Sequence, residues 1–111
     1  MARTTVYVTL VVNGNPEVQF DRDIWGDSKM RWREADDSPD FDFVSISGLP
    51  EDVFETTRVS NKKINVKDKM NTGVYPYTIT VRYQDTNGDW QTANSDMDAP
   101  NAEGGRPVIR N

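Results

Sequence analysis

Carboxylates are the side chains whose number and spacing in this sequence could support chemistry. The 111-residue chain contains neither histidine nor cysteine, which removes the commonest general base, the thiolate nucleophile and the nitrogen and sulfur ligands of metals. Asp36, Asp37 and Asp40 crowd into one short acidic stretch, with Asp42 just beyond it. Carboxylate oxygens bind hard cations when a loop lets them converge, whereas a solvated acidic loop is the commoner use of such a run. We therefore take Asp36, Asp37 and Asp40 as candidate ligand-binding residues.

A second group of polar side chains precedes Trp90. Asp85, Asn87 and Asp89 follow the order Asp-x-Asn-x-Asp, which is typical of the start of a calcium-binding loop. Such a loop needs glycine at its sixth position for a sharp bend, and here that position is Trp90. The pair Asn87-Gly88 favours an alternative, a simple hairpin turn, because both residues tolerate positive φ angles. Asp85, Asn87 and Asp89 are the candidate metal ligands, and no cofactor is expected.

Three tryptophans could act as stacking platforms for a sugar or a peptide. Tryptophan is usually buried because of its large apolar area, so at least two of the three should lie in the core. Trp25 stands beside Gly26 in a segment rich in aspartate, and it is the one that we expect at the surface. Trp32 and Trp90 are expected in the core.

The stretch from Gly73 to Thr92 predicts a hairpin on which these groups depend. Successive side chains of a strand point to opposite faces, so the alternation over residues 75–83 places three tyrosines, an isoleucine and a valine on one face. A type I′ turn at Asn87-Gly88 then leads into a second strand. Pairing across this two-residue loop sets Trp90 opposite Asp85, which brings Trp90 onto the aromatic face. Such a face is stable only when another apolar layer covers it.

The rest of the chain predicts short strands at the spacing of a β-sandwich. Seven to eight apolar runs are separated by turn residues, and the one helical feature is a turn near residues 50–54. The length suits a single domain over residues 1–111, with a loop at 94–106 and a terminal strand or tail at 107–111. We therefore predict an all-β, antiparallel two-sheet sandwich. Its expected core contains Val6, Val8, Leu10, Phe20, Trp32, Phe43, Ile46, Val66, Tyr77, Ile79, Val81 and Trp90.

The segment Asn71-Thr72-Gly73-Val74-Tyr75-Pro76-Tyr77 resembles the Asp-x-Gly-x-Tyr-x-Cys signature of immunoglobulin-like domains. With the Thr-Ile-Thr-Val that follows, it is similar to bacterial immunoglobulin-like and PKD-like modules. The resemblance implies an immunoglobulin-like sandwich of seven to eight strands, in which Tyr75 forms a tyrosine corner by bonding to upstream main chain. Tyr77 stands where the family has a cysteine, so no disulfide is implied. A cupredoxin-like topology stays open, without a copper site, because histidine and cysteine are absent. The resemblance brings no active site with it.

Charge is distributed unevenly along the chain. The net charge of −5 argues against nucleic acid as a partner, because phosphate is bound mainly by cationic side chains. Residues 1–55 carry five basic and 12 acidic side chains, a net charge of −7, whereas residues 56–111 carry eight and six, a net charge of +2. Solubility is the simplest explanation, and complementary faces within one fold or between copies are another. Four lysines within residues 62–69 suit either a docking site or protection of a sheet edge.

These observations favour a non-catalytic binding or assembly module that uses loops or a sheet edge to contact another protein or a second copy. The alternative is a carbohydrate- or calcium-binding accessory domain working through Trp25 and the acidic loops. A small hydrolase is a third hypothesis, but so small a sandwich rarely encloses a substrate cleft, so we do not expect an enzyme. The N-terminal apolar run alternates as a strand does and is about half a membrane span long. We expect no signal peptide, no transmembrane segment and no membrane partner.

Overall fold

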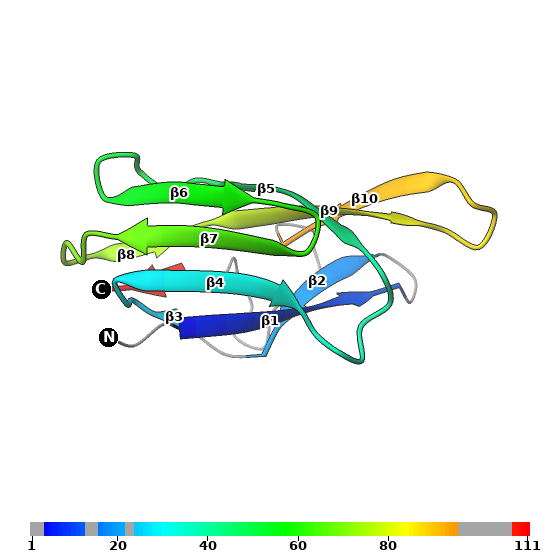
Figure 1. The fold of residues 1–111 in the computed structure, drawn as a ribbon, viewed down its shortest axis with the longest axis horizontal. Coiled ribbons are helices and arrows are strands. Elements are labelled where there is room, and N and C mark those ends of the chain that lie inside the picture. The colour runs from blue at the N-terminus through cyan, green and yellow to red at the C-terminus, as the bar shows by residue number, and fades with distance from the viewer. Residues whose placement is uncertain (1–3, 13–15, 22–23, 96–107) are drawn as a thin grey trace.

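The computed structural model describes residues 4–12, 16–21, 24–95 and 108–111, and within these ranges the chain is built from strands and turns (Figure 1). The described strands are β1 (Thr4–Val11), β2 (Glu17–Phe20), β3 (Ile24–Trp25), β4 (Lys29–Glu34), β5 (Asp42–Ser47), β6 (Phe54–Val59), β7 (Lys63–Asp68), β8 (Val74–Pro76), β9 (Thr78–Gln84), β10 (Trp90–Asn94) and β11 (Val108–Arg110). The all-β prediction is confirmed. These eleven strands exceed the predicted seven to eight, because pieces of two or three residues such as β3, β8 and β11 are too short to show alternation. The described part of the chain contains no helix capable of crossing a bilayer.

The strands form three hydrogen-bonded sheets. The largest has the order β2-β1-β4-β7-β6, and the two three-stranded sheets have the orders β10-β9-β5 and β3-β11-β8. In Figure 1 the five-stranded sheet lies toward the viewer and the smaller sheets lie behind it. Only Tyr77 separates β8 from β9, so the two smaller sheets share a nearly continuous strand. The inner face of the five-stranded sheet packs against both, because one core cluster includes Trp32 of β4, Val81 of β9 and Ile109 of β11.

The prediction of a wholly antiparallel fold is wrong at two places. β1 and β4 pair in parallel, with Thr4 opposite Met30 and Val6 opposite Trp32, and β3 also pairs in parallel with β11. The path of the chain explains the first of these pairs. After the β1–β2 hairpin the chain passes through β3 in another sheet before it returns as β4, so no tight turn forces β4 to run antiparallel to β1.

The core lies between the layers and is centred on Trp32. This side chain has no exposed surface, and its ring lies 5.4 Å from that of Tyr77 at an angle of 62°. Trp32 Nε1 donates a hydrogen bond to Tyr77 Oη over 3.3 Å, so the polar atom of the buried indole is satisfied. Phe20 and Ile46 are partly buried against the same cluster. The predicted core residues that are buried are Val6, Val8, Leu10, Trp32, Phe43, Val66, Tyr77, Ile79 and Val81.

Tyr75 holds the approach to β9. Its hydroxyl lies 3.0 Å from the carbonyl oxygen of Asn71 and 3.3 Å from that of Thr72. This contact with upstream main chain is the one that the resemblance implies for a tyrosine corner. The Tyr75 ring packs edge-to-face on Phe54 with 5.0 Å between ring centroids. A Cβ at Gly73 would lie 2.9 Å from the Tyr75 hydroxyl, which explains why glycine stands there.

The loop of the β9–β10 hairpin is one residue longer than predicted. Trp90 pairs with Gln84, not with Asp85. Asp85 N donates to Asp89 O over 2.9 Å and Gly88 N donates to Asp85 O over 3.0 Å, which closes a three-residue loop in place of the predicted two-residue turn. Gly88 supplies the left-handed residue that such a loop needs, with a φ of 84°. A shift of one residue turns a side chain to the opposite face, so Trp90 lies outside the core and is 56% exposed.

Three smaller predictions concern the connections. The loop expected at 94–106 lies outside the described residues except for its first two positions. The terminal strand expected at 107–111 is β11, which lies between β3 and β8. The helical turn expected near residues 50–54 is a single hydrogen-bonded turn, in which Phe54 N donates to Pro50 O over 2.9 Å.

Candidate functional site

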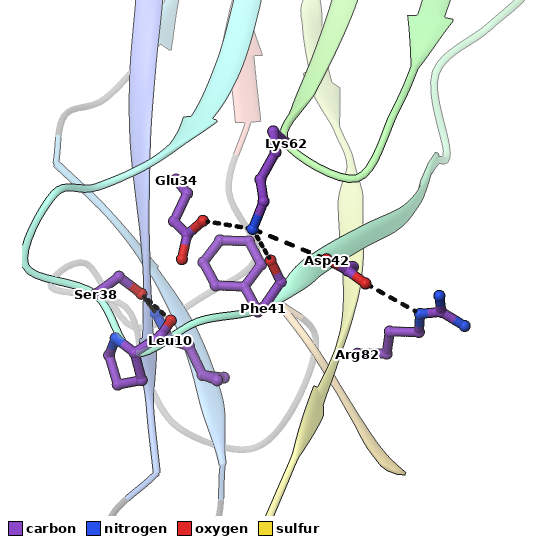
Figure 2. Close-up of polar contacts among 8 residues, drawn as sticks. Leu10, Glu34, Ser38, Phe41, Asp42, Lys62 and Arg82 are labelled. Atoms are coloured by element: carbon purple, nitrogen blue, oxygen red, sulfur yellow. Dashed lines mark hydrogen bonds and ion pairs between the residues drawn. The ribbon is translucent and has the colours of Figure 1, made fainter.

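The acidic loop between β4 and β5, residues 35–41, is held in place by Lys62. This lysine lies in the turn between β6 and β7. Its Nζ donates to Glu34 Oε1 over 3.2 Å and to the carbonyl oxygen of Phe41 over 3.4 Å (Figure 2). The same Nζ lies 3.9 Å from Asp42 Oδ1. One ammonium group therefore joins the residues that flank the loop at both ends.

Two further contacts fix the loop to β1 and β9. Leu10 N of β1 donates to Ser38 Oγ over 3.0 Å, and Ser38 Oγ in turn donates to the carbonyl oxygen of Pro39 over 2.9 Å. Just after the loop, Asp42 Oδ2 lies 3.6 Å from Arg82 Nε of β9. Figure 2 shows these contacts on either side of the Lys62 side chain. The loop is thus tied to strands of two different sheets.

A groove of about 590 Å³ opens between this loop, the end of β1 and the β9–β10 turn. Leu10, Phe41 and Tyr83 contribute to its apolar lining, and all three are largely buried. Trp90 also lines the groove, and it is one of the most exposed large hydrophobic residues among those described. The volume is within the range of pockets that bind small molecules.

One residue from each of the two groups of polar residues that the sequence singled out lines the groove. Asp40 of the acidic loop and Asp85 of the β9–β10 turn both line it, although 45 positions separate them in the chain. The remaining candidates are exposed and lie outside the lining: Asp36, Asp37, Asn87 and Asp89. Among the residues that the structure describes, no three histidine, cysteine, aspartate or glutamate side chains converge as metal ligands.

The carboxylate of Asp85 is engaged by its own turn. Asp85 Oδ1 accepts the main-chain N–H groups of Asn87 over 2.9 Å and of Asp89 over 3.0 Å, and Oδ2 accepts Gln91 Nε2 over 3.1 Å. The Asp89 N–H is the largest influence, and with Gln91 and Asn87 it lowers the pKa of Asp85 from its ordinary value. An aspartate that bonds to main chain two and four residues ahead is typical of a turn. This use accounts for Asp85 without a metal ion.

The three tryptophans are distributed differently from the prediction. Trp32 is buried as expected, whereas Trp90, expected in the core, lies on the outer side of the hairpin. The guanidinium of Arg82 lies 4.7 Å from the centre of the Trp90 ring, a cation–π contact across the hairpin. Trp25 belongs to β3, where its main chain pairs with Arg110. The predicted exposure of Trp25 concerns a side chain outside the described part of the structure.

Sequence reasoning missed Trp90 as a groove residue because it assumed the wrong turn. A signal for the correct turn was present. Aspartate at the first position and glycine at the fourth favour a type I turn, and Asp85 and Gly88 stand at this spacing. A type I turn followed by a left-handed glycine gives the three-residue loop that is observed.

Comparison of the chain with protein-family models, with curated proteins and with solved structures finds no match.

Proposed function

We propose that this protein is a non-catalytic binding or assembly module with an immunoglobulin-like two-sheet sandwich fold, and that it binds a partner protein in the groove beside Trp90. The sandwich is supported by the apolar faces of the large and small sheets, which pack together around Trp32 and Tyr77. The contact between the Tyr75 hydroxyl and the main chain at Asn71 supports the same class.

The exposed indole of Trp90 beside an apolar groove is the observation that carries the binding role. Tryptophan is enriched among the residues that dominate binding energies at interfaces, because it buries a large area and has few rotatable bonds. The contact with Arg82 restrains the ring before any partner arrives. A restrained side chain loses less entropy on binding, so Trp90 is suited to enter a pocket on a partner.

The carboxylates of the groove favour binding over catalysis. Asp42 lies within 4.0 Å of both Lys62 and Arg82, and Asp85 accepts three hydrogen bonds from its own turn. A general acid or base works best with a pKa near the operating pH. The pKa of Asp85 is shifted the other way, below its ordinary value. Asp85 can therefore shape the charge of the groove while it remains ionised.

The test is a peptide library displayed on phage and screened against the folded protein, with Trp90→Ala as the probe variant. We expect selected peptides to lose at least about tenfold in affinity for Trp90→Ala, which corresponds to about 1.4 kcal/mol. Val74→Ala is the matched control, because Val74 is also an exposed hydrophobic residue (63%) but lies on β8, outside the groove. Peptides that bind Trp90→Ala as well as the parent protein would contradict the proposal.

A carbohydrate-binding accessory role is the second candidate. Trp90 and Asp40 together offer an aromatic surface and a carboxylate, the pair of groups that can stack on a sugar ring and accept hydrogen bonds from its hydroxyls. A glycan array probed with the parent protein and with Trp90→Ala separates the two roles. Glycan binding that Trp90→Ala abolishes, without any peptide hits, would favour the carbohydrate role over the protein-binding one.

A further inference from the structure

The outer face of the five-stranded sheet is basic, although the protein carries a net charge of −5. This is the face toward the viewer in Figure 1, because the smaller sheets lie behind it. Buried residues alternate with cations along β4 and β7, which places the cations on the side away from the core. We define the basic face as Lys29, Arg31, Arg33, Arg58, Lys63 and Lys67.

Strand register brings like charges together on this face. Lys29 lies directly opposite Lys67, and Arg33 lies directly opposite Lys63. Like charges at directly opposed positions destabilise an antiparallel pair. Glu55 lies opposite Lys67 from the other side, and it is the one acid on this face of β4, β6 and β7. Within the described parts of the chain, none of the six cations has an ion-pair partner within 4.0 Å.

Protection of a sheet edge does not explain the basic face. Lysines do discourage exposed edges from pairing with other chains, and β6 is an edge strand. However, Lys29, Arg31 and Arg33 lie on β4, which is the middle strand of the five. Lys63 and Lys67 lie on β7, which is also an interior strand, so five of the six cations have no edge to protect. An external anion would offset the repulsion among them.

The matching negative charge is present in the same chain. Asp36 and Asp37 are exposed in the acidic loop and form no ion pair with the described residues. A cavity of about 290 Å³ lined by Tyr7, Arg33 and Asp36 lies where the loop meets the basic face. We propose that the basic face docks Asp36 and Asp37 of a second copy of this protein. Because the two patches are neighbours, a two-fold dimer can form both contacts at once.

A second copy fits this face better than nucleic acid or an anionic membrane. The net charge of −5 repels such polyanions at long range. The second copy carries the same overall charge, but it presents two exposed carboxylates beside a basic surface of its own, so attraction is reciprocal at short range. Tyr7 of β1 pairs with Arg33 of β4 and is 40% exposed. Its ring therefore adds apolar area to the contact. Neither the basic face nor the two aspartates include any residue that lines the groove.

Sedimentation velocity of the full chain tests the proposal, at about 20 mM and about 500 mM salt, where screening is weak and strong. We expect a dimer at low salt that dissociates at high salt. Lys29→Glu with Arg33→Glu replaces two cations of the face by acids and gives Lys67 and Lys63 opposite-charge neighbours, so folding is preserved. Asp36→Lys with Asp37→Lys reverses the charge at both of these positions in the acidic loop. Each double variant should be monomeric at low salt, and an equimolar mixture of the two should regain the dimer.

Glu51→Lys with Asp52→Lys is the control, because these acids are also exposed but lie in the turn before β6, and this variant should dimerise as the parent does. A parent protein that stays monomeric at low salt overturns the proposal, as does a dimer that survives both reversals. Binding of the monomeric parent to vesicles containing phosphatidylserine or to heparin, lost in Lys29→Glu with Arg33→Glu, would assign the face to a polyanion and also overturn it. Trp90→Ala should leave the dimer intact, which separates this test from that of the groove.

Discussion

Trp32 and Tyr77 form a hydrogen bond across the layers, with the indole N–H of β4 donating to the hydroxyl of the residue between β8 and β9 over 3.3 Å. Both side chains are fully buried, and their rings also meet edge-to-face. The contact joins the five-stranded sheet to the junction of the two smaller sheets. It fixes the relative position of the layers as well as filling the core.

Tyr77→Phe should lower the free energy of unfolding by about 1–3 kcal/mol, because the buried Trp32 N–H then loses its acceptor. Urea unfolding followed by circular dichroism measures this change. Tyr7→Phe is the matched control, since Tyr7 is 40% exposed and its hydroxyl has no hydrogen-bond partner among the described residues. That control should change stability by less than about 0.5 kcal/mol. Equal effects of the two variants would contradict the role of the Trp32–Tyr77 bond.

The loop of the β9–β10 hairpin predicts opposite outcomes for two neighbouring substitutions. Gly88 has a φ of 84°, whereas Asn87 is not among the described residues with positive φ. Gly88→Ala should therefore destabilise the protein by about 1–2 kcal/mol, and Asn87→Ala should be nearly neutral. Thermal unfolding of both variants is the measurement. A large loss with Asn87→Ala would instead favour the two-residue type I′ turn, which needs positive φ at both positions.

Acid stability should depend on Asp85. Its pKa in the folded protein lies below the ordinary value of 3.8, so the unfolded chain binds the proton more tightly. The stabilisation is therefore fully present above about pH 3.8 and is lost as the pH falls through the lower, folded pKa. Asp85→Asn keeps an acceptor for the turn but removes the titration. Its melting temperature should fall less steeply with acidification than that of the parent, and parallel curves would contradict the prediction.

Iodide quenching should distinguish Trp90 from Trp32. Trp90 is 56% exposed and Trp32 is fully buried, so Trp90→Phe should reduce the quenchable part of the fluorescence. Trp32→Phe should leave that part unchanged in absolute intensity, provided that the variant remains folded by circular dichroism. Loss of quenching in Trp32→Phe but not in Trp90→Phe would place Trp90 in the core, as the two-residue turn had suggested.

Local alternation was sufficient to predict which side of β9 is buried. Tyr77, Ile79, Val81 and Tyr83 are all largely buried, as the pattern over residues 75–83 indicated. The prediction worked because side-chain direction in a strand depends only on the parity of the position. The same argument failed on β10, because the residues of β10 that face the core are set by the number of residues in the loop before it. A one-residue error in that loop moved Trp90 from the core to the groove.

The amino-acid sequence by itself determined the all-β class, most of the buried positions and the absence of histidine and cysteine chemistry, because these depend on composition and on neighbours along the chain. Only the tertiary structure decided that β4 pairs in parallel with β1, that Asp40 and Asp85 line one groove, and that Lys29 opposes Lys67. Each of these relationships joins residues far apart in the chain. Strand partners and registers are set by which apolar faces can pack together over the whole fold, and no short segment contains that information.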